Sequence, residues 1–312
     1  MKIVLTILMF CFVIPNQLYP GTFGDELKNL IINTYKTNFT LGYNAARDTL
    51  YLRIDRINGE VKGIYTNYSM NLPNGVDPST HLYNNGSNNG INCEHIWPQS
   101  LGAGQEPQKS DMHSIRPCKS NVNTVRGNKP FGESNDNQTD SWCWLNYQTS
   151  NIPSSQINEY SESNSVNFEP REDRKGDIAR SIYYFYTMYT DVADENFFNS
   201  QKEILFNWHL QDDPDDNEIY RTWAIASYQQ NKPNPFIIDS SLIERIYFWE
   251  DILSGDINVD HALDILDLVY MTNIILNFNT YSDYELSILD INQDNSFDVL
   301  DIVNFVQIIL GE

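Results

Sequence analysis

Residues 93–132 decide the fold, because they hold C-E-H-I-W-P-Q-S-L-G at 93–102, S-D-M-H-S-I-R-P-C at 110–118 and N-V-N-T-V-R-G-N-K-P-F-G at 121–132. The first segment sets a carboxylate beside an imidazole, at Glu94 and His95. A carboxylate oxygen suits a hard cation, and an imidazole takes a proton from water readily. This pair therefore predicts metal-assisted hydrolysis of a phosphodiester.

The local pattern predicts a strand, a second strand and a helix in that order. Residues 91–98 read as a short strand ended by Pro98, residues 113–117 as a second strand, and residues 118–128 as a helix closed by Gly127. Candidate catalytic residues on the first strand and a metal ligand near the end of the helix form a ββα-metal arrangement. Because neighbours on a regular strand point to opposite faces, Glu94 and His95 share a site only at a bulge or strand end.

Three of these runs together resemble the bacterial endonuclease I family, whose members are non-specific secreted or periplasmic nucleases. They are E-H-I-W-P-Q-S, S-D-M-H-S-I-R-P and R-G-N-K-P-F-G. Further blocks extend the resemblance to about residues 25–250: Y-N-A-A-R-D-T-L-Y-L-R-I-D, F-E-P, K-G-D-I-A-R and Q-N-K-P-N-P-F-I. The resemblance implies that Glu94 and Asn128 hold Mg²⁺, that His95 is the general base, and that products carry 5′ phosphates.

Several residues of this centre also have plainer interpretations. Arg116 and Arg126 suit a phosphate or the charge of a transition state, but surface charge explains each equally well. Asn128 follows Gly127 and has the position of a helix C-terminal turn residue. His113 competes with His95 for the role of base, although a hydrogen-bonded structural histidine is the commoner case.

The charge of the chain, −22, argues against a nucleic-acid partner until its distribution is considered. Residues 251–312 hold twelve Asp and Glu and neither Lys nor Arg, whereas residues 91–132 hold five Lys and Arg against three acidic residues. A mildly basic cleft on an acidic body suits weak, salt-sensitive, non-specific binding of DNA and possibly RNA.

The first residues predict export. One lysine followed by an apolar run at 3–14 fits a signal peptide over 1–24 and is too short to span a membrane. No later run is long enough to span one either. A secreted, cell-surface or periplasmic protein follows, and an oxidising compartment makes a disulfide among Cys93, Cys118 and Cys143 plausible, with the pairing open.

The fold class that we expect is α+β, with a mainly helical nuclease domain at 25–250 around the ββα-metal motif. Helices are predicted at 25–36, 43–54, 176–189 and 217–229, and a strand within 59–68. Residues 72–92 and 135–171 are polar and predict exposed loops. The aromatic residues Trp142 and Trp144 of the second loop suit base stacking or, more commonly, a buried anchor.

An acidic pattern repeats after 34 residues in the segment 251–312. Its members are Asp256, Asn258, Asp260, Asp264 and Asp267, and then Asp290, Asn292, Asp294, Asp298 and Asp301. Oxygen ligands at loop positions 1, 3, 5, 9 and 12 match a Ca²⁺-binding loop, although His261 and Asn295 replace the usual glycine at position 6. Helices are expected at 265–276 and 299–310.

The duplicated loop with a single helix looks like a type I dockerin, which docks secreted enzymes onto cohesin-bearing partners. The resemblance implies a small all-α calcium-binding domain with a possible cohesin-like or cell-surface partner. The whole chain is then a secreted, Mg²⁺-dependent, non-specific endonuclease. Two alternatives remain: a phosphodiesterase acting on other esters, and a Ca²⁺-dependent scaffold protein with an inactive nuclease-like part.

Overall fold

The computed structural model of the chain describes residues 17–276 and 283–311, with backbone alone at 283–285. They divide into two compact units, one of residues 23–252 and one that joins residues 17–22 to the C-terminal segment from Leu253. Helices and strands are mixed along the chain, as the α+β expectation requires. Phe23 is buried and lies under the guanidinium of Arg245 at 5.5 Å, so a mature chain starting near residue 25 would lose this contact.

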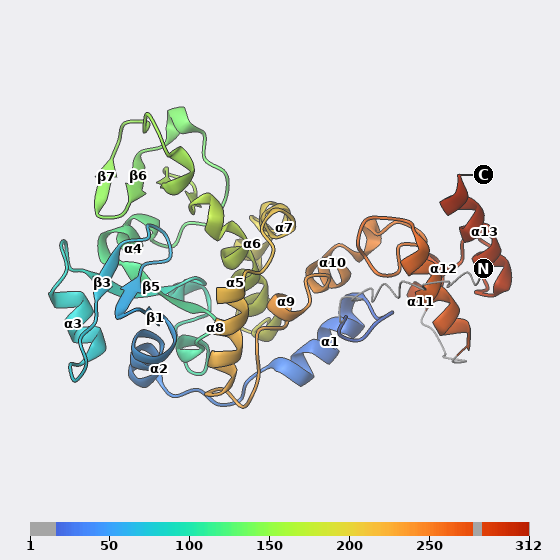
Figure 1. The fold of residues 1–312 in the computed structure, drawn as a ribbon, viewed down its shortest axis with the longest axis horizontal. Helices are drawn as coiled ribbons and strands as arrows, with labels where there is room; N and C mark the ends of the chain where they lie inside the picture. Colours follow the sequence, from blue (N-terminus) through green and yellow to red (C-terminus); the bar gives the residue numbers. More distant parts are fainter. Residues whose placement is uncertain (1–16, 277–282, 312) are drawn as a thin grey trace, which may run out of the picture. The chain divides into compact units, whose positions relative to one another are not determined.

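A strand pair and a helix form the centre of the larger unit (Figure 1). Strand β4 (Ile91–His95) pairs antiparallel with β5 (Ile115–Lys119), and α4 (Ser120–Arg126) follows β5 without a loop. The helix ends at Gly127, whose φ of 59° is easily adopted only by glycine. The predicted order of strand, strand and helix is therefore confirmed.

The segment before this centre packs against it. Helix α1 (Gly24–Tyr35) is followed by α2 (Tyr43–Thr49), which continues as a π-helical turn over Leu50–Ile54. Strands β1 (Arg56–Ile57), β2 (Glu60–Lys62) and β3 (Ser69–Asn71) form an antiparallel sheet.

The loop expected at residues 72–92 contains a helix, α3 (Pro78–Asn84). Asp77 caps it by accepting a hydrogen bond from the Thr80 amide at 2.7 Å, and Pro78 occupies its first turn. The loop prediction is wrong there because the abundance of Asn and Gly hid this N-terminal signal.

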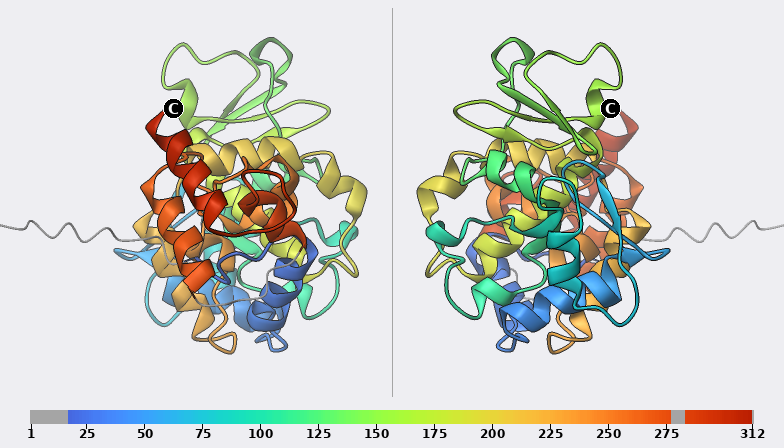
Figure 2. Two further views of the ribbon diagram at one scale, coloured as in Figure 1. Left: turned by 90° about the vertical axis from the view of Figure 1, so that its right-hand side faces the viewer. Right: turned by 90° about the vertical axis from the view of Figure 1, so that its left-hand side faces the viewer.

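A four-stranded sheet replaces the loop expected at 135–171. Its order is β7-β6-β8-β9, with β6 (Ser141–Trp144), β7 (Tyr147–Thr149), β8 (Ser161–Ser163) and β9 (Phe168–Glu169). It lies at one end of the larger unit, at the top in Figures 1 and 2. Trp142 is fully buried, so this aromatic residue is an anchor of the sheet.

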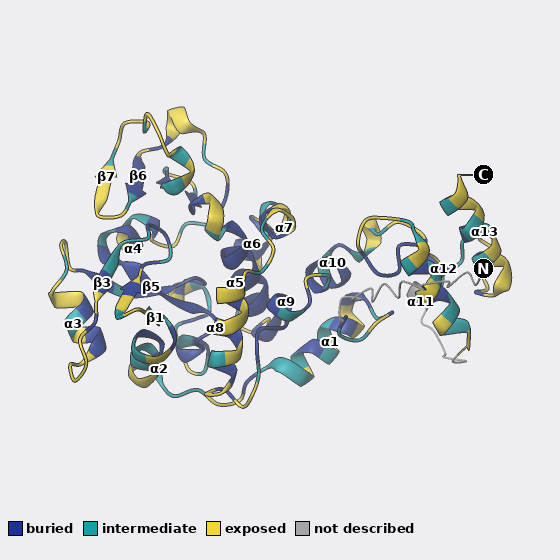
Figure 3. Ribbon diagram, viewed as in Figure 1, coloured by how far each residue is buried: buried dark blue, intermediate teal, exposed yellow. Residues whose placement is uncertain are grey.

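Helix α5 (Lys175–Met188) is buried along its whole length, as its apolar sequence predicts (Figure 3). The shorter helices that follow it in the chain are α6 (Glu195–Asn199), α7 (Lys202–Gln211), α8 (Asp216–Ala226), α9 (Pro235–Ile238) and α10 (Leu242–Tyr247). Trp97, two residues after β4, stacks on Phe185 of α5 at 4.8 Å. This contact fixes the end of β4 to the core.

The smaller unit contains α11 (Ile265–Leu276), α12 (Asp283–Leu289) and α13 (Val299–Leu310). The first and last of these match the helices expected after the acidic loops. Among the described residues of the chain, no helix is both long and apolar enough to cross a membrane.

Candidate active site

Glu94 lies in a buried pocket of polar groups at the end of β4. Its side chain is almost completely enclosed, and its Oε1 accepts a hydrogen bond from the Tyr65 hydroxyl at 2.8 Å. Nη1 of Arg126 lies 3.4 Å from the same oxygen. Burial raises the pKa of Glu94 to about 7, although Arg126 and Tyr65 oppose the shift. A divalent cation would favour the ionised carboxylate, so this environment suits a metal ligand.

Arg126 holds the end of α4 against the end of β4. Its Nη2 donates to the carbonyl oxygen of Ile96 at 2.7 Å, and its Nη1 donates to the carbonyls of His95 and Gly127 at 3.3 and 3.1 Å. The guanidinium is 1% exposed and is occupied by these protein acceptors. From this position Arg126 can orient the carboxylate of Glu94.

His95 has one ring nitrogen fixed by the backbone and one available as a base. Nε2 lies 3.0 Å from the carbonyl oxygen of Lys109, which only accepts hydrogen bonds, so Nε2 carries the proton. Nδ1 then has a free lone pair and receives the amide of Gln99 at 3.2 Å. Burial lowers the pKa of His95 to about 4, so the ring is neutral at neutral pH.

The two neighbours use opposite sides of the strand, as strand geometry requires. Glu94 meets Tyr65 and Arg126, whereas the His95 ring stacks on Tyr43 of α2 with centroids 5.4 Å apart. His95 is the last residue of β4, which gives the strand end that the sequence argument needed. Nη1 of Arg126 contacts both the Glu94 carboxylate and the backbone carbonyl of His95, whereas the His95 ring lies on the other side of the strand.

Asn128 is exposed just after the end of α4. Its amide nitrogen donates to the Ser100 hydroxyl at 2.9 Å, in the turn Gln99–Leu101 that also brings Gln99 to His95. This assignment turns the carboxamide oxygen away from Ser100. The turn thus links the candidate base and the candidate amide ligand, and carboxylate and carboxamide oxygens are the donors that Mg²⁺ prefers.

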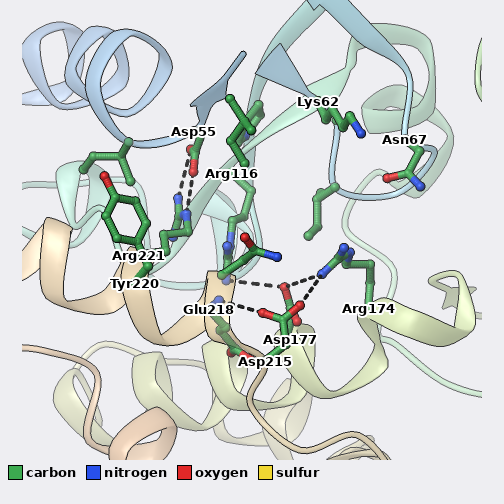
Figure 4. A pocket seen from close by; sticks show the side chains of 16 residues that line it. Asp55, Lys62, Asn67, Arg116, Arg174, Asp177, Asp215, Glu218, Tyr220 and Arg221 are labelled. Carbon is green, nitrogen blue, oxygen red and sulfur yellow. Dashed lines mark hydrogen bonds and ion pairs between the residues drawn. The ribbon is translucent and has the colours of Figure 1, made fainter. Parts of the chain in front are cut away.

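The Arg116 side chain lies apart from these residues, although Arg116 is the register partner of Glu94 on the adjacent strand. Its side chain extends into a cavity of about 280 Å³, where Asp177 is its ion-pair partner (Figure 4). Neither Glu94, His95 nor Asn128 lines this cavity. Contacts therefore join Arg126 to Glu94 and to the backbone of His95, Asn128 contacts Ser100 in the turn after β4, and Arg116 faces the cavity.

Sequence reasoning missed the residues that orient the pair. Tyr65, Gln99 and Tyr43 contact Glu94 or His95 directly, and only Gln99 carried a signal, its place four residues after His95. His113 is a structural residue, as the commoner interpretation held. It is buried, and its Nε2 lies 2.9 Å from the carbonyl of Lys232 on the chain before α9.

The three cysteines of this unit are buried, and their thiols are free. Burial raises the pKa of Cys93 to about 12 and that of Cys143 to about 11, which makes both thiols unreactive. The expected disulfide among Cys93, Cys118 and Cys143 is not formed in this structure.

The two acidic loops of the smaller unit fold by the same hydrogen bonds. In the first, Asp256 accepts from the amides of Asp260 and His261 at 3.1 and 3.0 Å, and Asp267 accepts from Ile257 and Asn258. In the second, Asp290 accepts from the amides of Asp294 and Asn295. Asp301 accepts from the amide of Asn292. Asp264 and Asp298 each accept from the amide two residues later, at the start of the helix.

The first loop gathers three carboxylates. Asp256, Asp260 and Asp267 each offer an oxygen within 4.8 Å of the others. Burial, followed by repulsion from the other two carboxylates, raises the pKa of Asp267 to about 6, although backbone hydrogen bonds oppose the shift. At position 6, His261 and Asn295 have φ of 64° and 66°. They adopt the left-handed conformation that glycine usually supplies, which histidine and asparagine tolerate better than most residues.

Comparison with known proteins identifies relatives of the larger unit. The family model described as Endonuclease I matches residues 22–241. An extracellular ribonuclease of Bacillus subtilis (strain 168) is 28% identical over 248 residues, which covers 73% of this chain and 76% of the relative. An extracellular ribonuclease of Bacillus amyloliquefaciens is 29% identical over 180 residues, covering 53% and 56%.

Proposed function

The chain belongs to the endonuclease I family and is a nuclease, and we propose that it hydrolyses nucleic acids with one Mg²⁺ held by Glu94 and Asn128 and with His95 as the general base. One observation carries the proposal. A neutral imidazole with an unprotonated Nδ1, which faces the Gln99 amide, ends the strand on which a buried carboxylate precedes it. A single turn connects that imidazole to an exposed carboxamide.

The proton transfer follows from the hydrogen bonds of His95. A water oxygen attacks phosphorus and its proton passes to Nδ1, while the bond from phosphorus to the 3′ oxygen breaks. The 3′ oxygen takes a proton from solvent to become a hydroxyl, and the other end is a 5′ phosphate. The Lys109 carbonyl holds the ring by Nε2, so Nδ1 points toward the Gln99 side, where the water must lie. Gln99 is exposed and is free to give way to that water.

The residues present fit a hard cation. Oε1 of Glu94 is engaged by Tyr65 and Arg126, which leaves Oε2 as the oxygen available for a ligand bond. Bound Mg²⁺ would supply positive charge to a phosphate oxygen and to the departing 3′ oxygen. Arg126 then acts on the reaction through Glu94, because its Nη1 and Nη2 donate to backbone carbonyl groups.

The proposed substrates are RNA and DNA. The attacking group is water, so the reaction does not need the ribose 2′-hydroxyl. The two relatives carry the name extracellular ribonuclease, and this supports RNA as a substrate and secretion of the protein. The proposed signal peptide covers residues 1–24.

Both acidic loops of the smaller unit are proposed Ca²⁺ sites. The convergence of Asp256, Asp260 and Asp267 supports the first, and the same hydrogen-bond pattern supports the second. Metal binding would stabilise a unit with a small core. A dockerin-like role with a cohesin-like partner stays a prediction from the sequence.

The proposed function is tested by incubating the full chain with single- and double-stranded DNA and RNA in Mg²⁺ or in EDTA. We expect all polymers to be cut in Mg²⁺, with 5′-phosphate ends, and none to be cut in EDTA. A small phosphodiester run in parallel separates a nuclease from a general phosphodiesterase. RNA products ending in 2′,3′-cyclic phosphate would refute water as the nucleophile, and full activity in EDTA would refute the metal.

A further inference from the structure

A polar cavity of about 280 Å³ lies beside β5, outside the group formed by Glu94, His95 and Asn128. The turn between β2 and β3, strand β5, and the starts of α5 and α8 form its walls (Figure 4). The side chains used below are Lys62, Asn67, Arg116, Arg174, Asn217 and Tyr220. The wall also holds Asp55, Asp177, Asp215 and Glu218, so its four cations stand beside four carboxylates.

Arg116 is a buried cation that lacks hydrogen-bond partners. Its side chain is 8% exposed, and no hydrogen bond from its guanidinium reaches the described residues. Its ion-pair partner Asp177 lies 3.9 Å away, beyond hydrogen-bond distance. Burial, with repulsion from Arg221, lowers its pKa to about 10, so it stays charged at neutral pH. Buried guanidinium groups are normally satisfied, so Arg116 lacks an acceptor.

The acidic residues of the cavity do not supply that acceptor, because other arginines hold them. Asp55 accepts from Arg221 at 2.7 and 3.2 Å. Glu218 is held by Arg180, which lies under the cavity. Among the cations that line the cavity, Arg116 has only the distant Asp177 as a partner, and the exposed ammonium of Lys62 has no ion-pair partner among the described residues.

An aromatic surface adjoins the cationic wall. Tyr220 lines the cavity from α8 and is 61% exposed. Trp223, one turn further along the same helix, is 53% exposed. Exposed rings beside arginine and lysine are the usual means of binding a nucleic-acid strand without reading its sequence, because bases stack on the rings while cations hold the phosphates.

We propose that this cavity binds a backbone phosphate of the nucleic-acid substrate outside the scissile bond, with Arg116 and Lys62 as its cations and Tyr220 stacking on a neighbouring base. The inference rests on the proposed function, since it assigns a second contact to the same substrate. Arg116 and Glu94 are register partners on adjacent strands, whose backbones lie about 5 Å apart, so the cavity wall and the candidate site share the β4–β5 pair. The cavity thus favours polymers over short esters.

Binding is measured in EDTA, so that the result does not depend on cleavage, with a fluorescent single-stranded oligonucleotide and anisotropy over a range of salt concentrations. Arg116→Gln, Lys62→Ala and Tyr220→Ala are compared with Lys202→Ala, which removes an equal charge from α7 outside the cavity. We expect affinity about tenfold weaker for Arg116→Gln, the usual effect of losing a charge-assisted hydrogen bond. Lys202→Ala should bind like the wild type.

The salt dependence identifies a lost phosphate contact. Each contact removed from a single strand lowers the slope of log K against log salt by about 0.7, so both cation variants should show this drop and Tyr220→Ala should not. The side chains of Lys62 and Tyr220 are on the surface, so Lys62→Ala and Tyr220→Ala should fold like the wild type, and Lys202→Ala should keep the wild-type slope.

Two results would overturn the inference. The first is an affinity and a salt slope that are unchanged from the wild type in both Lys62→Ala and Tyr220→Ala. This test remains valid even if Arg116→Gln fails to fold. The second is displacement of the labelled oligonucleotide by inorganic phosphate as readily as by unlabelled oligonucleotide. That result would make the cavity a site for free phosphate. Failure of the proposed function is distinct, because a wild-type protein that binds the oligonucleotide but never cuts it in Mg²⁺ would refute only the catalysis.

Discussion

Replacing His95 with alanine tests the centre of the mechanism. The change removes the Nε2 hydrogen bond to Lys109 and the stack on Tyr43. The hydrogen bond contributes about 1 kcal/mol to stability and the stack about 1 kcal/mol. Small domains have about 5–15 kcal/mol of stability, so the unit should remain folded. The loss of a general base, by contrast, should lower kcat by about 10²–10⁴-fold.

The assay is the initial rate of plasmid nicking at saturating Mg²⁺, with binding of Mn²⁺ measured separately. His209→Ala is the matched control, because His209 is also buried, also bonds a carbonyl, that of Ser240 at 2.8 Å, and also has a pKa lowered by burial to about 4. We expect His95→Ala to bind metal normally and to regain rate when free imidazole fills the space. Turnover within tenfold of the wild type, or an equal loss in His209→Ala, would refute the assignment of the base.

Three further predictions follow from other parts of the molecule. Asn128→Ala should weaken Mg²⁺ binding about tenfold, with rate recovered at high Mg²⁺, whereas Ser100→Ala should not; calorimetric titration decides, and equal affinities would remove Asn128 from the ligand set. Ca²⁺ at about one hundred times its dissociation constant should stabilise the smaller unit by about 2.7 kcal/mol per site, and Asp267→Asn should lose one site's share; a thermal scan insensitive to Ca²⁺ would contradict both sites. Burial lowers the pKa of His113 to about 4. Its unfolded form takes up a proton below pH 6.5 that the folded form refuses, so stability falls as pH drops from 6.5 to 4, by about 1.4 kcal/mol per pH unit. His113→Asn should remove that part of the slope in urea unfolding, and an unchanged slope would show that His113 is protonated in the folded protein.

Local patterns in the sequence predicted the parts of the structure that depend on local contacts. Two strands and a helix at β4, β5 and α4 follow directly from their own residues, and so do α11 and α13 after the duplicated loops. The buried helix α5 was predictable from its apolar sequence alone.

Contacts between distant segments explain what could not be predicted. Tyr65 reaches Glu94 from 29 residues away, and no pattern around either residue signals the contact. Arg116 and Arg126 looked alike in the sequence, yet one faces a cavity with Asp177 and the other is occupied by the carbonyls of β4. The short strands β6–β9 were missed because strands of two to four residues leave too little alternation to detect.

The enclosure of α5 has a consequence for biosynthesis. Every residue of α5 is buried, so this helix has no stable exposed state in water and must wait for residues downstream of it, including Glu218, the partner of its buried Arg180. During translocation an unfolded chain emerges from its first residue onward, and α5 is outside before α8 and α9 arrive. Fragments that stop before residue 216 should therefore aggregate or be degraded. Chains that lack only the acidic segment 251–312 should accumulate as soluble protein.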